Sequence, residues 1–225
     1  MHIHLRVHGF EGALKARVGK GFSLPDAVLE VVREAVTETK AVRFEGNNYA
    51  AEWVEEARRR GLLNLRTTPE ALAELVRPDA RAFLARAKVF SEAESDARYH
   101  VKLERYLKDI EVEVEALTDI VQAHVLPAAY KQLALLVSAG SSRTAKEARA
   151  RLEATVDDLS DRVASLHSVA ERAAGEGSLE KRAHLLAEET VPAMAAVREI
   201  CDRIEESVAD EFWTLPKYGE MLFLV

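Results

Sequence analysis

The sequence has little of the residues that interrupt helices or crosslink a chain. Its 225 residues include one cysteine, ten glycines and six prolines, and aromatic residues make up 6%. The single cysteine, Cys201, excludes an internal disulfide and a cysteine-rich zinc cluster, and it suits a reducing cytoplasm. Cys201 lies on an apolar stripe, and the sequence indicates no neighbouring general base that would activate it as a nucleophile. We therefore interpret it as a small buried hydrophobic residue.

Positive charge is outnumbered by negative charge. The chain carries 31 Lys and Arg against 38 Asp and Glu, and this net charge of −7 argues against nucleic-acid binding. The densest basic run, Arg58 to Arg60, follows Glu52, Glu55 and Glu56 at helical spacing, so we interpret it as a solvated helix face. No apolar stretch approaches the roughly 20 residues of a membrane span, and no signal peptide is recognisable. We expect a cytoplasmic protein without membrane contact.

Motifs of catalysis are absent as well. The sequence has no glycine-rich phosphate loop, no His-Glu-x-x-His, no Glu-x-x-His and no serine-hydrolase elbow. His2, His4 and His8 have a spacing that metal sites use, but they have no acidic partner and lie at a terminus. We therefore favour a poorly ordered or junction segment over residues 1–22 and assign no catalytic, cofactor-binding or metal residue.

What the chain does contain is helix-forming sequence, and regular structure is expected to begin at Ser23. Residues 23–90 predict several short helices with clear start signals: Ser23 and Asp26 form a capping-box pair, Thr67 precedes Pro69 and Glu70, and Pro78 opens another helix. Between them, 41–45 reads as a short extended piece, 46–48 as a turn and 50–60 as a helix closed by a glycine.

Residues 91–225 predict three long helices separated by loops near 139–142 and 175–177. Apolar residues recur at steps of three and four along each helix, and capping boxes are expected at Ser91 and Thr144. Short loops require an up, down and up arrangement. Pro127 and Pro192 fall inside the first and third helices and predict a kink in each. The expected fold is an all-α up-down bundle of three long helices, two kinked at proline, preceded by several short helices.

The C-terminal tail collects aromatic and apolar side chains beyond the last long helix. Left in water they would form a large apolar patch, so the tail either folds back on the bundle or docks on a partner. With two aromatic residues of the short-helix region, the candidate packing and interface residues are Tyr49, Trp53, Phe212, Trp213, Tyr218, Leu222 and Phe223.

Several motifs occur in the order and spacing of a known family. They include Gly46-Asn47-Asn48-Tyr49, Glu52-Trp53, Asn64-Leu65-x-Thr67-Thr68-Pro69-Glu70, Leu126-Pro127-Ala128, Val191-Pro192-Ala193-Met194 and Leu215-Pro216-x-Tyr218-Gly219-Glu220-Met221-Leu222-Phe223. From about Ser23 to Val225, the chain resembles the helical region that follows the catalytic domain in type III glutamine synthetases. It departs from the family pattern at Leu63 and Asp109, where proline and threonine are expected.

The resemblance implies a non-catalytic structural and assembly region of such an enzyme. The family makes glutamine from glutamate, ammonia and ATP, and its ATP, glutamate and magnesium residues match no position here. The chain alone is thus expected to be no enzyme and to need no cofactor. Its implied partners are a glutamine synthetase catalytic domain or further copies of itself. A stand-alone helical interaction or sensor module and an enzyme of unrecognised type are the alternatives.

Overall fold

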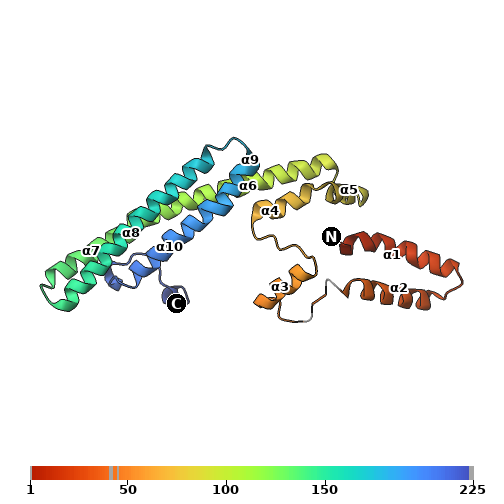
Figure 1. Ribbon diagram of the computed structural model, residues 1–225, viewed down its shortest axis with the longest axis horizontal. Coiled ribbons are helices and arrows are strands. Elements are labelled where there is room, and N and C mark those ends of the chain that lie inside the picture. Colours follow the sequence, from red (N-terminus) through yellow and green to blue (C-terminus); the bar gives the residue numbers. More distant parts are fainter. Residues whose placement is uncertain (1, 41–42, 45, 223–225) are drawn as a thin grey trace. The chain divides into compact units, whose positions relative to one another are not determined.

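The protein is helical throughout the part of the chain described here. A computed structural model describes residues 2–40, 43–44 and 46–222, of which helices make up 79% with no strand, and it confirms the all-α prediction (Figure 1). The chain divides into two compact units, Met1–Tyr99 and His100–Val225, which are described separately below.

Several helices of the first unit begin at the predicted signals. The Ser23 hydroxyl accepts a hydrogen bond from the backbone N–H of Asp26, and Thr67 and Glu70 form a complete capping box. Gly61, at a φ of +72°, follows the third helix as predicted. The helices are α1 (His2–Gly19), α2 (Leu24–Glu38), α3 (Ala51–Arg59), α4 (Thr68–Ala73), a 3-10 turn (Glu74–Val76) and α5 (Pro78–Arg86).

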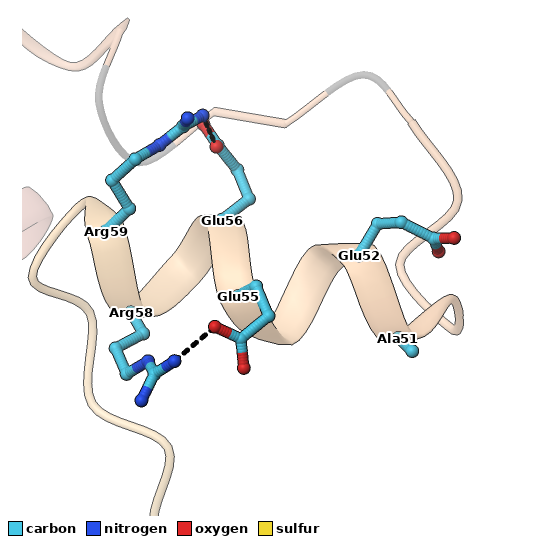
Figure 2. A pocket seen from close by; sticks show the side chains of 6 residues that line it. All are labelled: Ala51, Glu52, Glu55, Glu56, Arg58 and Arg59. Atoms are coloured by element: carbon cyan, nitrogen blue, oxygen red, sulfur yellow. Dashed lines mark hydrogen bonds and ion pairs between the residues drawn. The ribbon is translucent and has the colours of Figure 1, made fainter.

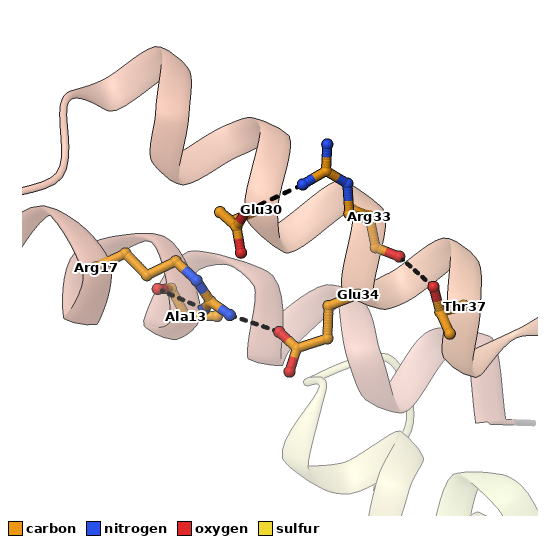
Figure 3. Close-up of polar contacts among 6 residues, drawn as sticks. All are labelled: Ala13, Arg17, Glu30, Arg33, Glu34 and Thr37. Carbon is orange, nitrogen blue, oxygen red and sulfur yellow. Dashed lines mark hydrogen bonds and ion pairs between the residues drawn. The ribbon is translucent and has the colours of Figure 1, made fainter.

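Helix α1 corrects the expectation that regular structure begins only at Ser23. Half-buried side chains recur along α1 at helical spacing, on Phe10, Ala13, Leu14 and Arg17. The Arg17 guanidinium donates to a carboxylate oxygen of Glu34 on α2 at 2.6 Å, which pairs the two helices as a hairpin (Figure 3). The sequence of residues 1–21 has no sustained apolar period and contains four glycines, so it did not predict a helix.

Two further predictions in the first unit fall partly on residues outside the description. The extended piece expected over 41–45 includes residues 41, 42 and 45, which lie outside the described residues. Arg43 and Phe44 are in neither helix nor strand, and the expected turn over 46–48 is a bend leading into a turn.

The second unit contains the predicted long helices, and α6 begins just before it. The first runs over 47 residues as α6 (Glu92–Ile120), a π turn η3 (Val121–Val125) and α7 (Leu126–Ser138). The second is α8 (Arg143–Ala174), and the third joins α9 (Leu179–Leu185), η4 (Leu186–Thr190) and α10 (Val191–Glu205). Ser91 and Glu94 make the predicted capping box, and the backbone N–H of Ser91 lowers the pKa of Glu94. The cap of α8 is Ser142, two residues before the predicted Thr144.

The core of the second unit lies along the predicted apolar seams, where the three long helices run side by side (Figure 1). Every predicted seam position from residue 103 onward is buried or half-buried. The largest fully buried side chains include Leu103, Leu159, Leu166 and Ile204. Among the described residues, only Ser95 and Thr190 are buried polar residues, so burial of apolar surface holds the bundle together.

A π turn immediately precedes each of the two prolines at which a kink was predicted. The N–H of Leu126 bonds to the carbonyl of Val121, and that of Val191 bonds to the carbonyl of Leu186, each five residues earlier. Proline lacks an N–H and its ring clashes with the carbonyl four residues before it. The wider π turn makes room for the ring, so each helix continues through its proline.

Candidate interaction surfaces

An aromatic and cationic cluster joins α3 to the segment after α2 in the first unit. The rings of Phe44 and Trp53 stack with centroids 4.2 Å apart, and the Arg60 guanidinium lies 5.7 and 5.8 Å from the two ring centroids. Arg60 also donates to the carbonyl of Arg43 at 2.6 Å. Trp53 thus packs within its own unit, whereas Tyr49 is fully exposed.

Arg60 differs from its two neighbours in the basic run. Arg58 and Arg59 are exposed and pair with Glu55 and Glu56 of the same helix, and these residues line a shallow hollow (Figure 2). The prediction of a solvated face is confirmed for Arg58 and Arg59. It is wrong for Arg60, which also pairs with Glu56 but is half-buried, with its guanidinium over the rings of Phe44 and Trp53.

The first part of the C-terminal tail folds back on the bundle. The backbone N–H of Ala209 donates to Gln132 of α7 at 3.2 Å, and His124 of η3 hydrogen-bonds to the Thr214 hydroxyl at 2.7 Å. Between these contacts, Phe212 and Trp213 are half-buried. His124 is therefore a hydrogen-bonded histidine at the edge of the seam.

The later part of the tail is only partly described. Leu222, at the end of α11 (Tyr218–Leu222), is 70% exposed, and Met221 is also exposed. The side chain of Tyr218 and the whole of Phe223 lie outside the described residues. Of the seven candidate interface residues, the structure thus covers Trp53, Phe212 and Trp213 within the chain and leaves Tyr49 and Leu222 open to solvent.

A second hollow lies between α6 and α8 in the bundle. The Thr118 hydroxyl and His167 Nε2 are 3.1 Å apart within it, and Glu115, Asp119 and Glu171 complete its polar lining. Among the described residues, no group of three or more His, Cys, Asp or Glu side chains has the geometry to hold a metal ion. The side chains of His2, His4 and His8 lie outside that description.

Cys201 is a buried free cysteine. Burial raises the pKa of the Cys201 thiol to about 11, which keeps it protonated and unsuited to nucleophilic attack at neutral pH.

The helix Glu92–Ser138 holds an 18-residue stretch that is long and apolar enough to cross a membrane, so the expectation that no such stretch exists was wrong. Core helices of soluble proteins pass the same test, so this is a weak indication.

The sequence is similar to one protein family and to several known proteins. A family model described as the glutamine synthetase C-terminal domain matches residues 27–143, just over half of the chain. A glutamine synthetase of Bacteroides fragilis is 28% identical over 97% of this chain and 32% of its own length. A type-3 glutamine synthetase of Dictyostelium discoideum is 28% identical over 87% of this chain and 28% of its own length. A glutamine synthetase of Butyrivibrio fibrisolvens is 26% identical over 98% of this chain and 33% of its own length.

The chain thus spans about a third of the length of the curated relatives that it matches. The matches cover both the short helices and the bundle, and they agree with the motifs that carry the resemblance. The chain therefore belongs to the glutamine synthetase C-terminal domain family and corresponds to the C-terminal helical region of a type III glutamine synthetase.

Proposed function

We propose that this chain is a non-catalytic structural and assembly region of a type III glutamine synthetase. The observation that carries the proposal is the nature of its interior. Among the described residues the buried side chains are almost all apolar, and the polar hollows are open ones on α3, beside the segment after α2, and between α6 and α8. A site for ATP, glutamate and ammonia needs converging polar groups in a water-excluded cavity.

In this proposal, catalysis belongs to the part of a glutamine synthetase that the chain does not match. That part supplies the residues for ATP and magnesium, and this chain requires neither to fold. The partner of the chain is a glutamine synthetase catalytic part, with self-association as a second form of assembly. We propose a cytoplasmic location, in keeping with the single unpaired cysteine.

The direct test measures ATP-dependent glutamine formation by the purified chain. We expect no activity from the chain alone, at any concentration of ATP, magnesium, glutamate and ammonia. The chain is then tested inside a chimera, in which it replaces the matching third of the Bacteroides fragilis glutamine synthetase. We expect that chimera to form glutamine, since the chain then supports a complete catalytic part.

Two outcomes would contradict the proposal. Robust glutamine formation by the chain alone would place a reaction centre in it. A chimera that assembles no enzyme, and no association when the chain and the rest of the relative are produced together as separate polypeptides, would remove the structural role.

A further inference from the structure

The hairpin of α1 and α2 leaves one apolar row of α2 uncovered. On the side of α2 that is buried, Ala27 is 0% and Val31 4% exposed. Arg17 on α1 holds α2 in this orientation against α1. Its guanidinium donates both to the carbonyl of Ala13 on its own helix and to Glu34 on α2 (Figure 3). The position of α2 against α1 is therefore fixed by burial and by a charged hydrogen bond.

The uncovered row consists of four large apolar side chains spaced four residues apart. Leu24, Val28, Val32 and Val36 are 61%, 38%, 42% and 44% exposed. Residues at this spacing form the ridge of a helix that most often packs into a groove on another helix. A continuous apolar row in water is unfavourable and marks a surface that another apolar surface covers.

The comparisons indicate which surface that is. The family model is that of a C-terminal domain, and its match begins at residue 27, within α2. The matched part makes up about a third of each relative, and its family model is that of a C-terminal domain, so the rest of such an enzyme precedes the segment corresponding to α1 and α2. A ridge at that place in the sequence lies where the preceding part of a glutamine synthetase is within reach.

We propose that the ridge Leu24, Val28, Val32 and Val36 docks against an apolar helix face in the N-terminal two-thirds of a glutamine synthetase. The inference rests on the proposed function and names the surface through which the structural role operates. A second copy of the chain, or another part of the same chain, would be a different occupant of the ridge, and the experiment separates them.

The experiment measures how fast a thiol on the ridge reacts with a maleimide. Val32→Cys places the thiol on the ridge, and Val101→Cys, at a valine of α6 that is 63% exposed, is the matched control. Each variant is labelled in the isolated chain and in the chimera with the Bacteroides fragilis enzyme. Cys201 is buried and serves as the internal reference for an intact fold.

We expect the ridge thiol to react at least about tenfold more slowly in the chimera than in the isolated chain, and the control thiol to react equally in both. A ridge thiol that is equally reactive in an active chimera would overturn the docking inference and leave the proposed function standing. Should the chimera not fold, the same comparison is made with the chain bound to the rest of the relative as a separate polypeptide.

Protection that is already present in the isolated chain would also overturn the inference. If that protection grows with protein concentration and accompanies a dimer in analytical ultracentrifugation, a second copy covers the ridge. If it is present in the monomer, the chain covers the ridge itself. Failure of both the chimera and the separate polypeptides to associate would instead overturn the proposed function, and this inference with it.

Discussion

Individual leucines in the second unit are shielded completely from water. Leu166 of α8 is 0% exposed and lies on the seam between the long helices. We expect Leu166→Ala to lower the free energy of unfolding by about 2–5 kcal/mol, since the substitution removes buried methyl groups and leaves a cavity. Urea unfolding followed by circular dichroism measures the change. Val112→Ala, at a valine that is 55% exposed, should change the free energy of unfolding by less than about 0.5 kcal/mol.

Cys201 provides a second prediction at the scale of the residue. Its raised pKa of about 11 leaves very little thiolate at pH 8, and its side chain is shielded from reagents. We expect DTNB to react with the native protein only slowly at pH 8 and to react rapidly in concentrated urea. Raising the pH toward 11 should favour the thiolate and speed the reaction. Fast reaction of the native protein at pH 8 would show that the thiol is accessible.

Single-residue contacts were the least predictable from the sequence. The sequence marked Trp53 as an aromatic candidate but did not indicate that Arg60 covers it, since the stacked Phe44 is nine residues away along an irregular segment. The bond from His124 to Thr214 joins residues 90 positions apart. Helical periodicity shows which side of a helix is apolar, but it does not show which loop or tail will reach it.

Helical elements were predicted more successfully, because caps and periodicity are local. The caps at Ser23, Thr67 and Ser91 are confirmed, whereas α8 uses Ser142 in place of Thr144. Both residues are good caps, and the sequence does not show which one lies at the last non-helical position. The hairpin helix α1 was missed because its sequence has no sustained apolar period and contains several glycines.

The π turns lead to a prediction at the scale of the element. A π turn is an α-helix with one extra residue, and here it accommodates a proline. Deleting the exposed Ala123 together with Pro127→Ala should therefore restore a regular α-helix and keep both flanking faces in register. We expect a cooperative unfolding transition close to that of the unaltered protein, measured by urea denaturation.

A matched deletion in α8 provides the control for this prediction. Ala154 is also exposed, but it lies in a regular α-helix, where deletion turns all following residues by about 100° relative to the core. We expect that variant to lose cooperative unfolding. Equal damage from the two deletions would contradict the assignment of the extra residue to η3.

One of the ion pairs between helices makes a predictable contribution to the free energy of unfolding. Arg182 of α9 pairs with Glu111 of α6, and each side chain is about 30% exposed. We expect Arg182→Ala to reduce the free energy of unfolding by about 1–2 kcal/mol, because the partly buried carboxylate of Glu111 loses its partner on the other helix and keeps only Lys108 of α6, at 3.5 Å. Arg149→Ala breaks an exposed pair within α8 and should cost about 0.5 kcal/mol or less. Thermal unfolding of both variants tests the difference.

At the scale of the whole molecule, burial is concentrated in one unit. Among the described residues, 21 of the 26 buried apolar side chains belong to His100–Val225. Protection of backbone amides follows buried apolar contacts. We expect hydrogen–deuterium exchange, followed by mass spectrometry, to be markedly slower in α8 and α10 than in α2 and α3. Uniform protection in both units would contradict this expectation.

The role of the whole chain was not predictable from physical patterns alone. Seams, caps and loops predict a helical bundle with an aromatic tail, and any of several binding or structural proteins would satisfy them. The family emerged from motifs such as Gly46 to Tyr49 and the segment around Pro216, and the comparisons support it. The buried and exposed residues of each unit show which surfaces are already covered within it and which are not.

The shielding of Cys201 also determines how a common assay should be interpreted. The chain has one cysteine, so a disulfide between two chains requires both copies of this residue to come to the surface. A crosslinked dimer on a non-reducing gel would therefore report unfolded or opened chains. It would not report a native assembly, however many copies that assembly contains.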